Sequence, residues 1–371
     1  MTPKILHVSA ARLSNGGVER FLLGLSQSLR NDYDFALLSG ADRQFSIQMQ
    51  EQGCTIFPWN VHRTIDFSAA RKLLDTIKLY SPDIVHFHDA RARFISRLSL
   101  EGGEVRTIYT VHLPPYYYRW RRFTSLRRFI YASMERILNT HFTTIVVYPS
   151  RRGWADALQH RYVQPHKTLC IPNGIDLQPF ELVRSEQTRQ DNTIPIICTV
   201  ARLSPEKNIG FLLEAAALLN KRKSSFHLWI VGEGPEYLAL VEQAKQLGLD
   251  SQTRFWGRQE AVVPILFQSD IFVLTSWYEG RSQAVMEAQA AGLPCVLSDV
   301  GDNAEMVDDG RGFLFSEGDL QACADSLEYL LKNQQERLHM GENARKNAFK
   351  VYNLKTMSDQ YRQIYQKLLV E

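Results

Sequence analysis

The chain has 371 residues, of which 44% are hydrophobic and 22% charged, with 21 glycines and 14 prolines. This globular composition, in a chain long enough for two hydrophobic cores, excludes collagen-like, low-complexity and disordered proteins. Residues 1–180 hold 23 Lys and Arg against 14 Asp and Glu, a net charge of +9, whereas the remainder holds 20 against 26, a net charge of −6. We therefore expect the two halves to face different partners.

Short apolar runs rich in β-branched residues alternate with helix-length amphipathic stretches from the start of the chain. Continuous apolar runs bounded by helices are typical of a parallel sheet that is covered on both faces. In the first half, the predicted strands are Lys4–Ala10, Asp34–Ser39, Asp83–His88, Thr107–His112, Thr144–Tyr148 and Thr168–Ile171.

A polar stretch, Arg184–Asn192, is the best candidate for a domain linker, and the strand pattern restarts after it. The organisation predicts an α/β chain with two Rossmann-like domains facing each other across a cleft. The later predicted strands are Ile196–Ala201, Phe226–Val231, Thr253–Trp256, Ile271–Thr275 and Pro294–Leu297, and the chain is helical from Leu320. The expected divisions are 1–180 for an acceptor-binding domain, 181–193 for the linker, 194–353 for a nucleotide-binding domain and 354–371 for a last helix.

Two adjacent glycines, Gly16 and Gly17, follow the first predicted strand and precede a helix that begins at about Gly17. Glycine lets the backbone approach a diphosphate closely, and a helix N-terminus offers free N–H groups and a positive dipole. The loop lacks the G-x-G-x-x-G spacing, and no acidic residue ends the second strand to hold a ribose. It therefore indicates either a phosphate-binding loop or a plain tight turn.

Two cations, Arg202 and Lys207, lie between the predicted strand Ile196–Ala201 and a helix expected to begin at about Asn208. Ligands of such domains bind outside the carboxyl ends of the strands. Permanent cations at that edge would stabilise an anionic leaving group. Solvation at the surface explains them equally well.

Two glutamates, Glu279 and Glu287, are separated by seven residues. Glu279 lies in the loop after the predicted strand Ile271–Thr275, and Glu287 lies in the next helix, backed by alanines. A carboxylate on a buried helix needs a partner, because its desolvation without one is costly. Hydroxyl groups of a sugar or ribose would serve as that partner.

Taken in chain order, the motifs resemble those of the retaining glycosyltransferases of family 4. They are Gly-Gly-Val-Glu (16–19), Pro-Asn-Gly-Ile-Asp (172–176), Arg-Leu-x-x-Glu-Lys (202–207), Val-Gly-Glu-Gly-Pro (231–235) and the two glutamates with seven residues between them. The resemblance covers almost the whole chain. It implies the GT-B fold, a nucleotide-sugar donor that is most commonly a UDP-sugar, transfer with retention, and no metal or other cofactor. It also implies that the last helix, about Leu354–Leu369, returns to the first domain.

The resemblance also implies roles for individual residues. Arg202 and Lys207 would bind the donor diphosphate, Glu279 would contact the transferred sugar, and Glu287 would hold the ribose hydroxyls. His112 matches the family's histidine beside the sugar, so the catalytic set would be His112, Arg202, Lys207 and Glu279. Further donor contacts would come from Gly16, Gly17, Gly257, Arg258, Gly280, Arg281, Ser282 and Gln283.

Arg281 departs from the family pattern, which usually has an apolar residue at this position. An added cation there either contacts a carboxylate of the donor or faces solvent. His86 and His88 have the alternating spacing of a metal pair, but no third ligand is evident, so we expect a role at the strand end, with His88 near acceptor or donor. The Asp32-Tyr33-Asp34 sequence resembles a D-x-D metal motif, but it lies where a strand begins, which indicates a structural role.

A basic and aromatic segment, residues 114–131, carries the charge excess of the first half. Such a segment favours an anionic membrane surface, with its aromatic residues at the level of the headgroups. A nucleic-acid patch and a solvated helix with its apolar face in the core are the alternatives. The residues expected to meet the acceptor or the membrane are Arg119, Trp120, Arg121, Arg122, Arg127 and Arg128.

Five scattered cysteines without a C-x-x-C pair indicate a reducing compartment, with neither a disulfide framework nor a structural zinc site. No apolar run is long enough to span a bilayer, and the first residues lack the apolar region of a signal peptide. We therefore expect a cytoplasmic protein, peripherally associated with the inner face of the cell membrane. Its expected partners are a nucleotide-sugar and a glycan or lipid-linked glycan of surface-polysaccharide or lipopolysaccharide assembly, and no nucleic acid.

Two other functions fit the same architecture. A sugar-nucleotide epimerase would convert the donor without an acceptor, although the two cations with the two glutamates look like the transferase arrangement. A non-catalytic protein that binds a sugar nucleotide is the second alternative.

Overall fold

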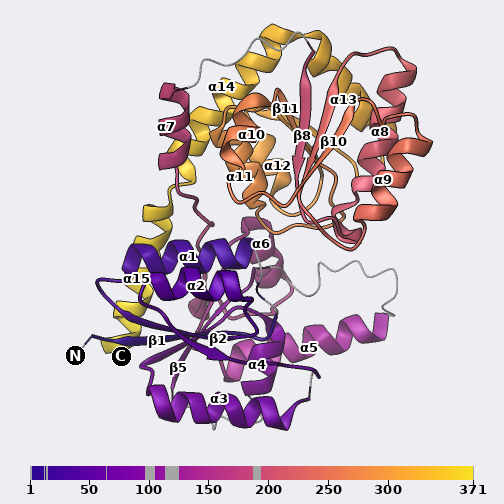
Figure 1. Cartoon of the computed structure of the whole chain (residues 1–371). Coiled ribbons are helices and arrows are strands. Elements are labelled where there is room, and N and C mark those ends of the chain that lie inside the picture. Colours follow the sequence, from indigo (N-terminus) through magenta and orange to yellow (C-terminus); the bar gives the residue numbers. More distant parts are fainter. Residues whose placement is uncertain are drawn as a thin grey trace. The chain divides into compact units, whose positions relative to one another are not determined.

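The computed structural model describes residues 2–11, 13, 16–63, 65–96, 105–112, 125–186 and 194–370 (Figure 1), with the side chains at 125–129, 131 and 183–186 left out. The chain divides into two compact units. Unit 1 comprises Met1–Gly174 and Leu354–Glu371, and unit 2 comprises Ile175–Asn353. The expected linker, 181–193, overlaps a helix of unit 2, α7 (Gln178–Glu186), and its remaining residues lie outside the described ranges.

Unit 1 is built on a seven-stranded sheet with the order β3-β2-β1-β4-β5-β6-β7, in which neighbouring strands are parallel. Alternate residues of β1 enter two cores, with Ile5 on one face and Leu6 on the other. The strand order reverses between β1 and β4, and ligands of doubly wound sheets bind at such a point. The strands are β1 (Lys4–Ser9), β2 (Asp34–Ser39), β3 (Thr55–Pro58), β4 (Ile84–Phe87), β5 (Arg106–Thr110), β6 (Ile145–Tyr148) and β7 (Thr168–Cys170).

Helices cover both faces of this sheet, with α1, α2 and α15 contributing to one core and α3, α4 and α6 to the other. Side-chain caps begin several of them; for example, the carboxylate of Asp66 accepts a hydrogen bond from the N–H of Ala69 at the start of α3. The helices are α1 (Gly17–Leu29), α2 (Arg43–Glu51), α3 (Phe67–Tyr80), α4 (Ala90–Ser96), α5 (Ser125–His141), α6 (Arg151–Gln159) and α15 (Leu354–Val370).

The last helix, α15, returns to unit 1, as predicted, and lies beside α1 (Figure 1). The two helices approach closely at Gly24, where an added Cβ would be 2.7 Å from Cδ1 of Leu354. Farther along α15, Arg362 forms an ion pair of 2.9 Å with Asp32, the first acidic residue of the D-x-D sequence. That aspartate therefore connects α15 to the start of β2.

Unit 2 is built on a six-stranded sheet with the order β10-β9-β8-β11-β12-β13, and its neighbouring strands are also parallel. The order reverses between β8 and β11, which predicts a ligand site at the carboxyl ends of these two strands. The strands are β8 (Ile196–Val200), β9 (His227–Val231), β10 (Thr253–Gly257), β11 (Ile271–Leu274), β12 (Cys295–Ser298) and β13 (Gly312–Phe315).

Two cores, one on each face, also flank the sheet of unit 2. The α/β class and the two Rossmann-like sheets are therefore confirmed. None of the described helices combines the length and apolarity that crossing a bilayer requires. The helices are α7 (Gln178–Glu186), α8 (Ile209–Lys221), α9 (Tyr237–Gln246), α10 (Val263–Gln268), α11 (Gln283–Ala290), α12 (Asn303–Val307), α13 (Leu320–Lys332) and α14 (Gln334–Val351).

Candidate functional site

The loops after β8 and β11 meet at the point where the strand order of unit 2 reverses. Nζ of Lys207 lies 2.6 Å from Oε1 of Glu279, and the same oxygen accepts a hydrogen bond of 2.8 Å from the hydroxyl of Ser276. The Lys207 side chain is 24% exposed and that of Glu279 is 10% exposed. Both bonds use Oε1, and no described residue donates to Oε2.

Backbone contacts hold Lys207 in this place. The short 3-10 helix Pro205–Lys207 ends at Asn208, which has a left-handed conformation and leads into α8. The hydroxyl of Thr275 donates to the carbonyls of Lys207 and Asn208, at 3.2 and 3.0 Å. The end of β11 therefore fixes the turn that presents the lysine, and the helix start expected at about Asn208 is confirmed.

Arg202 is exposed, and it forms no ion pair with any residue that the structure describes. Its backbone is framed by the loop after β9, where an added Cβ at Gly232 would lie 1.9 Å from the carbonyl oxygen of Ala201. An added Cβ at Gly234 would lie 2.2 Å from the carbonyl oxygen of Leu203. The Val-Gly-Glu-Gly-Pro motif is therefore explained by close backbone approach.

The loop that carries Glu279 is supported from the segment after β12. Gly301 has φ of +53°, and an added Cβ would lie 2.3 Å from the carbonyl oxygen of Glu279 and 2.5 Å from that of Gly280. The N–H of Asp302 donates to the carbonyl of Gly280 at 3.0 Å. Sequence reasoning missed Gly301, because the signal for it is a packing contact and not a motif.

Arg281 also connects the loop that carries Glu279 to the segment after β12. Its guanidinium lies 3.3 Å from the carboxylate of Asp302 and 3.4 Å from that of Glu305, and it lies over the ring of Tyr352 at 5.4 Å from the centroid. Arg281 is 6% exposed. The alternative in which Arg281 faces solvent is therefore wrong, because its guanidinium is buried within unit 2 and pairs with two acidic side chains.

Helix α11 begins directly after this loop. Ser282 is its N-cap residue, and Gln283 is its first helical residue. Glu287 lies in the second turn and is 8% exposed. The loop and helix therefore place Glu279, the N-terminal N–H groups and Glu287 along one continuous segment, as the resemblance implies.

The loop after β10 carries Gly257 and Arg258. Gly257 has φ of +65°, and an added Cβ would meet nothing within 4 Å. Its carbonyl accepts a hydrogen bond of 2.8 Å from the N–H of Gly232, and Arg258 lies 3.6 Å from the carboxylate of Glu233. The loops after β9 and β10 are thus connected at the two residues, Gly257 and Arg258, that are expected to contact the donor.

In unit 1, Gly16 and Gly17 stand at the N-terminus of α1, as predicted. An added Cβ at Gly16 would lie 2.9 Å from Oε2 of Glu19, which is buried in the first turn. Asp89, which follows β4, connects this strand to the end of β1. Its carboxylate accepts hydrogen bonds from the hydroxyl of Ser9 and the N–H of Ala10, at 3.0 and 2.6 Å. This arrangement occupies the β1/β4 switch point beside the N-terminus of α1, where Gly16 is the N-cap residue and provides no side-chain hydrogen bond to cap the helix.

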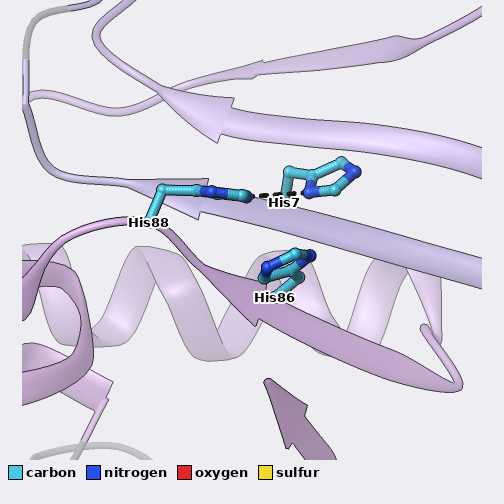
Figure 2. Close-up of side chains that lie close together, drawn as sticks. All are labelled: His7, His86 and His88. Atoms are coloured by element: carbon cyan, nitrogen blue, oxygen red, sulfur yellow. Dashed lines mark hydrogen bonds between the residues drawn. The ribbon is translucent and has the colours of Figure 1, made fainter. Parts of the chain in front are cut away.

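A cluster of buried histidines lies beside this switch point (Figure 2). His86 is hydrogen-bonded to Tyr365 of α15 at 2.8 Å, and His88 is hydrogen-bonded to His112 at 3.1 Å. The cluster also contains His7 of β1, which lies 2.9 Å from His88. Sequence reasoning missed His7, because only the register of β1 against β4 places it opposite His86.

Burial keeps these imidazoles neutral. Desolvation lowers the pKa of His7 and that of His112 to about 3. It also lowers the pKa values of His86 and His88 well below the ordinary value, and neighbouring imidazoles add to the effect. Neutral rings at these positions both donate and accept hydrogen bonds.

The free energy of unfolding should fall as the pH is lowered from about 6.5 toward 3. The imidazoles stay neutral in the folded protein, whereas an unfolded histidine accepts a proton below about pH 6.5. Each buried imidazole therefore costs about 1.4 kcal/mol of stability per pH unit in this window. Urea unfolding at several pH values should show a shallower dependence for His7→Phe and an unchanged one for His160→Gln at an exposed position. Equal curves for wild type and His7→Phe would contradict the prediction.

The basic segment is described only at its end. Arg119, Trp120, Arg121 and Arg122 lie outside the described residues; Arg127 and Arg128 lie in α5, but their side chains are not described. Farther along α5, the buried Glu135 pairs with Arg93 of α4 at 2.5 Å, and Arg93 lies over the ring of Tyr109 at 4.0 Å. This buried ion pair anchors α5 to the rest of unit 1.

Comparison with known proteins agrees with this geometry. Residues 15–179 match the family profile described as Glycosyltransferase Family 4, and residues 183–347 match that described as Glycosyl transferases group 1. The UDP-Gal:alpha-D-GlcNAc-diphosphoundecaprenol alpha-1,3-galactosyltransferase of Escherichia coli is 26% identical over 384 aligned positions, which cover 99% of this chain and 97% of that protein.

Solved structures show the same fold. The structure of HepE from Anabaena in complex with UDP-glucose superposes with a TM-score of 0.79 at 20% identity, covering 98% of this chain and 99% of that one. WaaG, a glycosyltransferase involved in lipopolysaccharide biosynthesis, superposes with a TM-score of 0.75 at 17% identity, covering 97% and 99%. These likenesses show the GT-B fold.

Proposed function

The chain belongs to family 4 of the glycosyltransferases, and on this premise we propose that it transfers a sugar from a UDP-sugar to a lipid-linked glycan, with retention and without a metal. The observation that carries the proposal is the pair formed by Lys207 and Glu279 at the β8/β11 switch point. A cation and a carboxylate with one unused oxygen are the groups that a leaving diphosphate and a sugar hydroxyl require.

In the proposed reaction, Lys207 and the exposed Arg202 offset the negative charge that develops on the departing diphosphate. Oε2 of Glu279 accepts a hydrogen bond from a hydroxyl of the transferred sugar. The acceptor hydroxyl attacks the anomeric carbon on the face that the diphosphate leaves, and the leaving phosphate takes its proton. No covalent intermediate with the protein is required.

A thermal-shift screen tests the donor. We expect UDP or a UDP-sugar to raise the unfolding midpoint more than GDP or ADP conjugates do, because a ligand that binds only the folded state stabilises it by about 2.7 kcal/mol at a hundredfold excess over its Kd. The relative from Escherichia coli is named for UDP-Gal, and the Anabaena structure contains UDP-glucose, which favours uridine. The shift should persist in EDTA; its loss there would contradict the metal-free proposal.

The acceptor has a candidate site within unit 1. A cavity of about 860 Å³ opens at the carboxyl ends of β1, β2 and β3, and its lining includes the polar side chains of Asn60, His62, Asp89 and Arg91 beside Trp59. Hydrogen-bonding side chains suit the hydroxyls of a sugar, whereas the Trp59 ring is 2% exposed and belongs to the core beside the cavity. We propose that the terminal sugar of the acceptor glycan binds here.

We propose that the basic segment, residues 114–131, binds the membrane that holds the lipid part of the acceptor. Replacing Arg121, Arg122, Arg127 and Arg128 with serine should release the protein from anionic vesicles, because each cation near an anionic surface contributes roughly 1 kcal/mol. The peripheral location at the inner face of the cell membrane and a role in surface-polysaccharide assembly rest on this segment and on the relatives. Sedimentation with vesicles that contain phosphatidylglycerol measures the binding.

A matched variant controls for net charge. Serine at the exposed Arg63, Arg71, Lys72 and Lys78 removes the same charge from unit 1 outside the segment. This variant should stay bound to the vesicles. Equal release of both variants would show that net charge, and not the segment, attracts the membrane.

A further inference from the structure

Three histidines of unit 1 form a continuous hydrogen-bonded chain. Nδ1 of His7 lies 2.9 Å from Nε2 of His88, and Nδ1 of His88 lies 3.1 Å from Nε2 of His112. The residues come from three neighbouring strands or the loops that follow them, namely β1, β4 and β5. Figure 2 shows the rings of His7 and His88 facing each other, with His86 beside them.

The hydrogen bonds account for this cluster better than a metal does. Nitrogen atoms of His7, His86 and His88 lie within 4.8 Å of one another. Both nitrogens of His86 are engaged, with Tyr365 at 2.8 Å and Thr110 at 2.7 Å. Both nitrogens of His88 are engaged by the neighbouring imidazoles. A metal needs a free lone pair from every ligand, and only Nε2 of His7 has no partner in the cluster.

The unpartnered Nε2 of His7 determines in which direction the hydrogen bonds between the three histidines run. A neutral imidazole carries one N–H and one lone pair, so the protons lie either on every Nδ1 or on every Nε2 along the three rings. With the protons on Nε2, His7 would bury an N–H that has no acceptor. With the protons on Nδ1, His7 leaves only a bare lone pair, and the N–H without a described acceptor lies instead on His112, which is half-buried, whereas His7 is fully buried. An orphaned N–H at the fully buried end is the costlier defect.

We propose that His7 and His88 are positioning residues that hold His112 in the tautomer with its proton on Nδ1. Nε2 of His112 then accepts from His88, and the Nδ1–H of His112 has no acceptor among the described residues. This N–H is a fixed donor at the carboxyl end of β5, and a sugar oxygen is the group that it fits. The identity of that ligand rests on the proposed function, whereas the tautomer does not.

The tautomer is measured directly by long-range ¹H–¹⁵N correlation spectra of the full chain, labelled at its histidines and recorded without ligand. We expect the His112 ring to show a protonated Nδ1 and an unprotonated Nε2, with the signals assigned by their loss in His112→Gln. A proton on Nε2 of His112 in the wild-type protein would overturn the proposal. Because no substrate is present, this result does not depend on the transfer reaction.

Two further variants test the link to His88. His88→Phe keeps a ring but removes both hydrogen bonds, so His112 should shift toward the Nε2–H tautomer that free histidine prefers. Tyr365→Phe removes the hydrogen bond of an equally buried side chain to His86, outside the chain of three, and should leave the His112 signals unchanged. An unchanged His112 pattern in a folded His88→Phe protein would show that His88 does not position it. If that variant does not fold, the wild-type spectrum alone decides.

Discussion

Replacing Lys207 with alanine should lower kcat about 10²–10³-fold, because it removes a cation that offsets charge on the leaving diphosphate. The melting temperature should change little. The lysine side of the ion pair is 24% exposed, and Glu279 keeps its hydrogen bond from the hydroxyl of Ser276 in the variant, which limits the loss of stability. The measurement is steady-state transfer from the donor that the thermal-shift screen identifies, together with a thermal melt.

Two companion variants separate the lysine's charge from its location. Lys207→Arg keeps a cation and should retain part of the activity, whereas Lys221→Ala removes an exposed lysine at the end of α8 and should retain all of it. Glu279→Gln keeps the shape of the carboxylate and removes its charge, so it should lower kcat without unfolding unit 2. Wild-type activity in Lys207→Ala would refute the assignment of the site.

Gly301→Ala should inactivate the enzyme without changing any residue proposed to touch a ligand. The left-handed backbone at φ of +53° costs a residue with a Cβ about 1–2 kcal/mol. The new methyl group would also lie 2.3 Å from the carbonyl oxygen of Glu279, and overpacking against backbone costs a further 1–3 kcal/mol or so. The Glu279–Gly280 loop must therefore move, and kcat should fall with it. Transfer kinetics and urea unfolding measure the two effects.

Gly318 provides the matched control. It has φ of +83°, and an added Cβ would meet nothing within 4 Å. Gly318→Ala should therefore show the backbone cost alone, with kcat unchanged. Similar loss of activity in both variants would show that backbone strain, and not the contact with Glu279, explains the effect at Gly301.

Local patterns explain why the strands at the middle of each sheet were predictable. Residues 196–200 and 271–274 are buried strands and read as continuous apolar runs. Two of the four edge strands, β3 and β13, escaped prediction, because their residues are largely half-exposed or exposed, whereas the edge strands β7 and β10 were predicted. Edge strands pair on one side only, so burial shapes their sequence less.

The candidate site was predictable to the extent that its chemistry depends on residue type. Lys207 and Glu279 were singled out from the sequence, and the structure places them 2.6 Å apart. Arg281 was not predictable, because the difference between a cation for a ligand and one for the interior depends on Asp302 and Glu305.

The sequence by itself determined the two parallel-sheet units and the loops that carry the glycines, cations and glutamates. These follow from hydrophobic period and motif, which are properties of neighbouring residues. Only the tertiary structure decided that Gly301 supports the Glu279 loop and that His7 joins His88 and His112. Strand order and register bring such residues together, and both arise from packing between segments far apart in the chain.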